Sequence, residues 1–540
     1  MTSNNSKKDL AGLIISAAVF ALGLILALFY IFTREIVVYN IDHTDTLFWA
    51  AASVKSNSFI DRSYWYVYII PFSGYLLMIP TVMMFGVTYL AHELGMALFV
   101  IVMTAALVFG FRALKMTYKR SFFLTGLLLI LMNSSANTRV IFFGHVIHYS
   151  IALIFTFVAL ILLDKTGCLR VDKFDRRQKI YYAVFVIWCF LCCMNGSSVV
   201  LLYMIPLSGA IVLERLLDPE KLTLLGIKLP LIRFAGILAG GGAGFLYKRY
   251  RIQPFFDNSY EEKFSSLLAH DQWMWKEQGF IVRFVTLLTG DVYDGTPMLS
   301  TDGIFIMLRL MLGLMLLIIP VIALFFYRKT KNRLVRILLL DYWVLFIITY
   351  ITYGVSVVSN TNWRLCTLLC MAFAVSACFL YMMIKEGFAA RFVYIALLII
   401  FPALLTIPVS VYRLPSDPSL NGYVRMAKVL DENGLTYGYS GLWGGADVMD
   451  VLTDSRIRMS MISFDQDGSY GIVRYQSEAS CYEDQPGVSR YFVVVGNDGL
   501  DTVKDTLVKN ASEQIPFEDS TILVFDGNIF KDGQPVYAPQ

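Results

Sequence analysis

An acidic motif follows directly after the first apolar segment of the chain. Residues 39–52 read Tyr-Asn-Ile-Asp-His-Thr-Asp-Thr-Leu-Phe-Trp-Ala-Ala-Ala, with Asp42 and Asp45 three positions apart. If this segment is helical, Asp42, Asp45 and Trp49 share one face. Two carboxylates beside an aromatic ring suit a general base that takes a proton from a hydroxyl group. The structural alternative is an acidic helix start, where Asp stabilises the helix dipole.

Basic and imidazole side chains near the ends of later apolar segments could bind an anion such as phosphate. A guanidinium group can bind phosphate through two hydrogen bonds, and a charge inside an apolar span is costly unless it serves a function. The structural alternatives are contact with the membrane surface for Arg and Lys, and hydrogen bonding inside a bundle for His. The candidates are Arg364, Arg139, His145, His148, Lys248, Arg251 and Arg309. On a helix, His145 and His148 would share a face.

Three aromatic residues are candidates for contact with an acceptor molecule. Trp49 belongs to the acidic motif, while Tyr439 and Trp443 lie beside a glycine-rich turn that leads into a predicted helix. The glycine spacing matches neither a P-loop nor a dinucleotide-binding turn. Packing inside a domain is the alternative for Tyr439 and Trp443.

The sequence predicts no metal site and no firmly implied cofactor. Nothing near the two histidines completes a ligand set. The pairs Cys189/Cys193 and Cys366/Cys370 lie in apolar segments, where small packing residues are the expected role. A divalent cation remains an open possibility.

The composition excludes a water-soluble globule. The 540 residues are 57% hydrophobic and 16% charged, whereas soluble domains carry about 25% charged residues. A transmembrane helix needs about 20 apolar residues, and about eleven segments qualify. We expect spans near 10–33, 87–111, 121–137, 140–163, 180–195, 198–213, 229–247, 304–327, 334–357, 363–384 and 391–412.

Residues 66–86 are apolar and long enough to cross, but Pro71 and Pro80 interrupt a straight helix. If they do not cross, the basic loops near 112–120, 165–179 and 328–336 all lie inside the cell, as the positive-inside rule favours. We therefore predict an outer re-entrant or interfacial element at 66–86. The N-terminus is then cytoplasmic, and everything after the last span is extracytoplasmic.

Two domains are expected on this basis. Residues 1–412 form an α-helical polytopic membrane domain with outer segments at 34–86 and 248–303. Residues 413–540 alternate apolar runs with helical patterns, which predicts a small α/β domain with a mostly parallel sheet. Residues 464–488 are polar and irregular, so we expect a long loop there.

The acidic motif resembles that of the GT-C superfamily of polytopic glycosyltransferases, and within it the protein mannosyltransferase and aminoarabinose-transferase group. That group commonly carries Asp-Glu-x-x-x-Ala after the first span, at the start of a juxtamembrane helix. Asp45-Thr46-Leu47-Phe48-Trp49-Ala50 fits this register. Thr46 stands where Glu is usual, which weakens any metal-assisted mechanism. Residues 66–86 would be the second juxtamembrane element.

The resemblance implies a hexosyl- or pentosyltransferase with a polyprenyl-phosphate sugar as donor. It also implies an inverting reaction, in which one displacement occurs at the anomeric carbon. Asp45 would be the base and Asp42 the reserve candidate. An Arg is often found in the family at the position of Arg364. The acceptor would be a cell-envelope glycan, lipid or protein outside a bacterial cell membrane. Membrane lipids are expected partners and nucleic acid is not.

Two other classes of function are compatible with a polytopic membrane protein. A transporter or flippase of lipid-linked precursors would need charged residues deep in several spans and often has an internal repeat; the sequence offers little of either. A non-catalytic envelope scaffold would tolerate Asn at Asp42 and Asp45.

Overall fold

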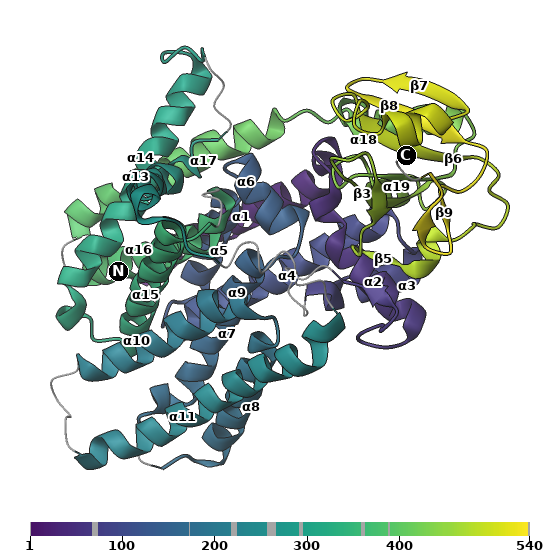
Figure 1. The fold of residues 1–540 in the computed structure, drawn as a ribbon. Helices are drawn as coiled ribbons and strands as arrows, with labels where there is room; N and C mark the ends of the chain where they lie inside the picture. Colours follow the sequence, from purple (N-terminus) through teal and green to yellow (C-terminus); the bar gives the residue numbers. More distant parts are fainter. Residues whose placement is uncertain are drawn as a thin grey trace.

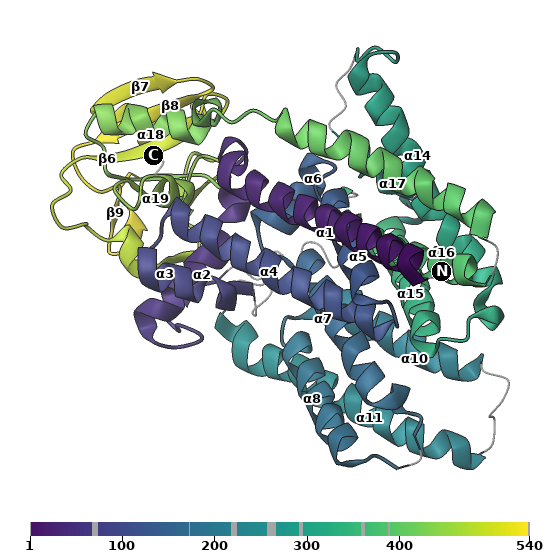
Figure 2. The same ribbon diagram turned by 180° about the vertical axis from the view of Figure 1, so that it is seen from behind.

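The computed structural model describes residues 2–66, 74–171, 173–217, 224–255, 266–290, 295–357, 362–386 and 389–537. A large helical bundle carries a small sheet domain at one end (Figure 1). The N-terminus lies at the opposite end of the bundle from the sheet domain (Figure 2). This arrangement agrees with a membrane domain followed by a separate outer domain.

The bundle consists of long apolar helices. They are α1 (Thr2–Thr33), α4 (Tyr89–Ala113), α5 (Tyr118–Leu131), α7 (His148–Lys165), α8 (Arg176–Cys193), α10 (Ile205–Leu216), α11 (Leu224–Tyr247), α14 (Thr301–Phe325), α15 (Arg333–Val355), α16 (Cys366–Lys385) and α17 (Ala389–Tyr412). Within the described residues, nine helical stretches are long and apolar enough to cross a membrane. The remaining two of the eleven predicted spans correspond to α5, which has 14 residues, and α8, which begins on two arginines.

Two predicted spans differ from the structure in their bounds. The segment 121–137 is interrupted because α5 ends at Leu131, and Ser135 then caps the short helix α6 (Ala136–Arg139). The segment 140–163 begins with a π-helical turn (Val140–Gly144) and is extended at His145, so α7 starts only at His148. The prediction that His145 and His148 share a helical face is therefore wrong.

Close contact between α1 and α5 depends on small residues. A Cβ atom added at Gly23 would overlap the backbone of Gly126, and one added at Gly126 would overlap the backbone of Phe20. Small residues at such crossings let two backbones approach, which is the main source of packing energy between helices in lipid. The first span is thereby held against the bundle next to the acidic motif.

The first outer segment is made of short pieces. After η1 (Glu35–Val37) come η2 (Ile41–His43), α2 (Asp45–Ser56), β1 (Tyr64–Trp65), η3 (Gly74–Leu77) and α3 (Ile79–Phe85). The described part of 66–86 contains only η3 and the seven-residue α3, which has a proline in its first turn. Residues 67–73, which include Pro71, lie outside the described residues. No helix long enough to cross is found in the described part of this segment.

The second outer segment starts with a π-helical turn (Lys248–Ile252) and η8 (Gln253–Phe255). Helix α13 (His270–Thr286) follows, and α14 begins at Thr301. Residues 256–265 and 291–294 lie outside the described residues.

The sheet domain follows α17. Its main elements are α18 (Gly422–Glu432), β2 (Tyr437–Ser440), α19 (Val448–Leu452), β3 (Arg458–Phe464), β4 (Tyr470–Ile472), β6 (Tyr491–Gly496), β7 (Glu513–Phe517) and β8 (Ser520–Phe525). The strand order is β4-β3-β2-β6-β8-β7, and only the β3–β2 and β2–β6 pairs are parallel. The prediction of a mostly parallel sheet is wrong, because β8 pairs antiparallel with both β6 and β7, and β4 pairs antiparallel with β3.

The sheet domain is attached to the first outer segment. Strand β1 pairs antiparallel with β5 (Ser477–Glu478), which lies in the stretch expected to be a loop. Lys55 forms an ion pair with Glu478 at 2.7 Å. The Asn421 side chain donates to the carbonyl oxygens of Ile36 and Tyr39 at 2.6 and 3.0 Å. The domain therefore covers the acidic motif, and α2 lies beneath it (Figure 1).

Candidate functional site

Asp45 is the first residue of α2 and is buried, with 3% of its surface exposed. Its carboxylate accepts hydrogen bonds from the Gln476 side-chain amide and from the Tyr475 hydroxyl, the latter at 3.4 Å. Thr44 donates to the other end of the same amide, Gln476 Oε1, at 3.2 Å. Burial, helped by nearby Asp42, raises the pKa of Asp45 well above its usual value. Asp45 thus fixes a loop of the sheet domain to the membrane domain.

Asp42 lies in the preceding 3-10 turn and is half-buried. Asn40 caps this turn by accepting a hydrogen bond from the Asp42 backbone N–H at 3.0 Å. Among the described residues, no hydrogen bond or ion pair to the Asp42 carboxylate is found. The chain turns between the two acids, so the prediction of one shared helical face is wrong for Asp42. It holds for Asp45 and Trp49, which are four positions apart in α2. The two carboxylates face different surroundings.

A buried polar cluster lies behind Asp42. Glu35 Oε1 is 2.8 Å from His92 Nε2 and 3.9 Å from His43 Nε2, and all three side chains are fully buried. His145 Nδ1 lies 2.8 Å from the Asp42 carbonyl oxygen. Because a carbonyl only accepts, this contact requires a proton on Nδ1 of His145. The cluster therefore holds the backbone of the acidic turn.

Burial disfavours charge on the members of this cluster. Burial raises the pKa of Glu35 well above its usual value. Burial lowers the pKa of His43, and the nearby rings of His145 and His92 lower it further. A Cβ atom at Gly144 would lie 2.7 Å from His43 Nε2, so only glycine fits beside the cluster.

Two of the predicted phosphate-binding residues come from adjacent segments. Arg139 ends α6 and donates to the Asn133 carbonyl at 3.1 Å, with its guanidinium 5.5 Å from the centre of the Tyr30 ring. Arg364 is half-buried in η10 (Asn362–Leu365), which contacts α6. The two arginines therefore lie on elements that contact each other.

The other candidates lie in different surroundings. Arg309 is buried and donates to Thr406 Oγ1 at 2.8 Å, to the Thr406 carbonyl at 2.7 Å and to the Ser134 carbonyl at 3.1 Å. It therefore ties α14 to α17. Lys248 is buried against Gly196, with Nζ 2.9 Å from where a Cβ of that glycine would lie. Arg251 is exposed. His148 is buried with its ring centre 4.0 Å from that of Tyr149.

The three aromatic candidates also differ in their burial and contacts. Trp49 is 1% exposed and packs edge-on against Tyr66, with ring centres 4.8 Å apart. Tyr439 is fully buried in the sheet domain and donates to Asn528 at 2.8 Å. Both are packing residues in this conformation. Trp443 is 59% exposed, and its carbonyl accepts from Tyr423 at 2.8 Å. Only Trp443 offers a free ring face.

Sequence reasoning missed the residues that connect the two domains. Gln476 and Tyr475 lie more than 400 positions from Asp45, and no local pattern marks them. Glu35 and His92 were also missed, although a Glu and a His at the outer ends of two neighbouring spans are a usable signal. In the described part of the chain, no group of three or more His, Cys, Asp or Glu side chains is arranged to hold a metal ion.

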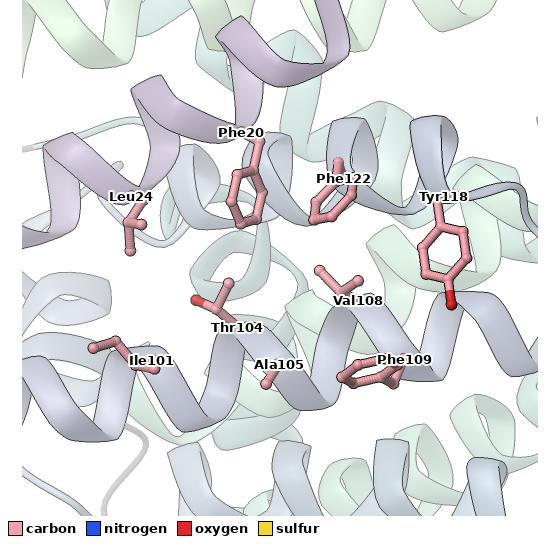
Figure 3. A pocket seen from close by; sticks show the side chains of 9 residues that line it. All are labelled: Phe20, Leu24, Ile101, Thr104, Ala105, Val108, Phe109, Tyr118 and Phe122. Atoms are coloured by element: carbon pink, nitrogen blue, oxygen red, sulfur yellow. The ribbon is translucent and has the colours of Figure 1, made fainter. Parts of the chain in front are cut away.

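An apolar groove of about 320 Å³ lies between α1, α4 and α5, away from these polar groups. Figure 3 shows its lining, which includes Phe20, Leu24, Ile101, Phe109 and Phe122. No charged side chain lines it. Its chemistry fits a hydrocarbon chain of a lipid.

No protein-family profile matches the chain, and no curated protein sequence matches it. Solved structures do match. ArnT from Cupriavidus metallidurans in the apo state gives a TM-score of 0.54 at 11% identity, over 94% of this chain and 97% of that chain. The same protein bound to undecaprenyl phosphate gives 0.51 at 10% identity, over 96% and 98%. An Archaeoglobus fulgidus oligosaccharyltransferase in complex with Zn and sulfate gives 0.47 at 12% identity, over 83% and 62%.

The chain is therefore a multi-pass membrane protein with the GT-C fold. The likeness to ArnT, an aminoarabinose transferase, covers 94% to 96% of the chain. The resemblance predicted from the acidic motif is confirmed at the level of the fold.

Proposed function

We propose that this protein is a membrane glycosyltransferase that moves a sugar from a polyprenyl-phosphate donor to an acceptor outside the cytoplasm. The observation that carries the proposal is the half-buried carboxylate of Asp42, for which the described residues offer no hydrogen-bond or ion-pair partner. The backbone of Asp42 is held by a buried cluster at the outer end of a GT-C bundle. In support, the ArnT of similar fold binds undecaprenyl phosphate.

The geometry favours Asp42 over Asp45 as the base. A base must reach the proton that it removes and must be ionised. Asp45 is buried and hydrogen-bonded to the sheet domain, and burial raises its pKa, which disfavours the ionised form relative to an exposed carboxyl group. Asp42 has no such partner among the described residues. We therefore assign the base role to Asp42 and the positioning of the sheet domain to Asp45.

The reaction needs one proton acceptor and one stabilised leaving group. Asp42 takes the proton from the acceptor hydroxyl, and that oxygen bonds to the anomeric carbon while the bond to the phosphate oxygen breaks. One displacement of this kind inverts the anomeric configuration. The departing phosphate gains negative charge, which fixed cations stabilise. Arg139 and Arg364 are the proposed cations; a divalent cation is an alternative source of the same charge.

The placement in the cell is part of the proposal. The basic loops favour a cytoplasmic N-terminus and an extracytoplasmic sheet domain. An activated sugar must then arrive on a lipid, because nucleotide sugars are made inside the cell. The apolar groove of α1, α4 and α5 is a suitable contact for membrane lipid. The expected acceptor is a bacterial cell-envelope component.

The test uses cells that lack the native gene and carry the full chain. Membranes are labelled with a radioactive sugar, and transfer from the polyprenyl-phosphate pool to envelope material is followed. Asp42→Asn should abolish transfer and leave the labelled lipid donor to accumulate. Asp61→Asn, in the same outer segment, is the matched control. Unchanged transfer in Asp42→Asn would remove this residue from the mechanism.

A further inference from the structure

A cavity of about 340 Å³ lies between α2 and the sheet domain. One face of α2 forms its membrane-side wall, through Phe48, Ala51, Ala52 and Lys55. The opposite wall comes from β1 and from the sheet domain. Ligand pockets usually measure about 300–1,000 Å³, so this one fits a small ligand.

Buried polar atoms without partners line the cavity floor. They are Tyr64 OH, Asp447 Oδ2 and Ser477 Oγ, and none has a hydrogen-bond partner among the described residues. The three residues are 5%, 4% and 3% exposed. Leaving such a group unpaired costs about 1–3 kcal/mol. Three such groups on three separate segments indicate that a polar ligand completes their hydrogen bonds.

The charges around the cavity nearly balance. Its lining includes the acidic residues Asp447, Asp450 and Glu478 and the basic residues Lys55 and Arg458. Glu478 already forms an ion pair with Lys55. This pair lies near the rim of the cavity, since the Lys55 side chain is 66% exposed. An anionic ligand would meet the carboxyl groups of the floor. A neutral ligand that both donates and accepts hydrogen bonds fits this lining best.

We propose that the cavity binds one neutral, hydroxyl-rich sugar unit, with Tyr64 and Asp447 as its deepest contacts. Adjacent hydroxyl groups can donate to a carboxyl group and accept from a phenol at the same time. The ring's carbon face would lie on Phe48 and the two alanines of α2. This assignment rests on the proposed function, under which the bound sugar unit belongs to the acceptor.

The cavity is linked to the acidic motif through Gln476. This side chain lines the cavity and also donates to the Asp45 carboxylate. Tyr64 and Asp447 both interact electrostatically with Asp45. A sugar in the cavity would therefore lie close to the turn that carries Asp42.

Binding can be tested without any transfer reaction. The full chain in lipid nanodiscs is titrated with methyl α-glucopyranoside, methyl α-galactopyranoside and methyl α-mannopyranoside, and saturation-transfer NMR reports binding. We expect at least one glycoside to bind, and Tyr64→Phe and Asp447→Asn to weaken it at least fivefold. Asp454→Asn is the matched control, because Asp454 is exposed, also has a positive φ and does not line the cavity.

A second measurement needs no cavity variant. Cys481 lines the cavity and is half-buried, so a bound glycoside should slow its alkylation at least threefold in a Cys168→Ala background. The proposal is overturned if no glycoside binds at 50 mM, which is about the weakest binding worth considering. It is also overturned if the Asp447→Asn variant binds the glycoside as tightly as the wild type does. Calcium chloride is titrated separately. If calcium binds in a way that depends on Asp447 and no glycoside binds, the ligand of the cavity is a cation and not a sugar.

Failure here and failure of the proposed function are distinguishable. Glycoside binding with no transfer in any labelled membrane leaves a sugar-binding protein. Transfer that continues without glycoside binding leaves the enzyme and removes the cavity from acceptor recognition.

Discussion

Two carboxylates three positions apart occupy opposite kinds of environment. Asp42 is half-buried, with no partner for its carboxylate among the described residues, while Asp45 is buried and bonded to the sheet domain. The difference arises because the chain changes from a 3-10 turn to an α-helix between them. Short spacing in sequence does not imply a shared role. One acid is available for chemistry, and the other joins two domains.

The sharpest way to break this comparison is to replace each acid alone. Asp42→Asn should lower transfer by about 100- to 10,000-fold, the range for loss of a general base. Asp45→Asn should stay within about tenfold of wild type, because an amide can still hydrogen-bond in place of a protonated carboxyl. Initial rates in labelled membranes measure both. The reverse ranking would assign the base to Asp45.

The cluster behind Asp42 should matter chiefly for stability. Glu35→Ala leaves His92 without its 2.8 Å partner, and an unpaired buried polar group costs about 1–3 kcal/mol. Thermal unfolding of the purified protein should show a clear fall in Tm. Glu478→Ala is the comparison, since its partner Lys55 is exposed. Equal falls in the two variants would contradict a special role for the cluster.

The interface beneath the sheet domain should respond to pH. Burial raises the pKa of Asp450 to about 7, so the folded state binds a proton that the unfolded chain releases near pH 4. Stability from this group is present at low pH and is lost as pH rises toward 7, by at most about 1.4 kcal/mol per pH unit. Asp450→Asn should flatten Tm between pH 5 and 7, whereas Asp454→Asn should not. An unchanged slope in Asp450→Asn would show that another group titrates.

The smallest expected effect is at the rim. The Lys55 side chain is 66% exposed in its ion pair with Glu478, and exposed pairs contribute about 0–1 kcal/mol. Lys55→Ala should lower Tm by only a degree or two. Gln476→Ala, at the buried end of the same interface, should lower Tm further. If Lys55→Ala lowered Tm more than Gln476→Ala, the exposed ion pair would be the stronger contact that holds the sheet domain.

The sequence predicted the apolar helices because hydropathy depends on local composition. The outer position of the acidic motif rests on the charges of the loops and stays a prediction. The segment 66–86 was also recognised as unable to cross, since prolines and loop charge are visible without a structure. Helix ends were less predictable: the apolar pattern runs on past Leu131, and the caps and the π-helical turn that end α5 and delay α7 have little hydropathy signal.

Contacts between distant segments could not be predicted from the sequence. The pairing of Gln476 with Asp45 depends on how the sheet domain sits on α2, and a single sequence carries no record of that. The mixed sheet was missed because β7 and β8 have the same apolar pattern in either direction. Burial of Trp49 and Tyr439 could not be separated from exposure, since aromatic residues are common in both settings.

The β1–β5 pair gives the sheet domain a second point of attachment besides the chain that leaves α17. The Asn421 and Gln476 side chains add further contacts between the domain and the first outer segment. Because β1 and β5 are joined by strand pairing, we expect them to move together in any small tilt of the domain. Tyr64 and Ser477 would then keep their distance from each other.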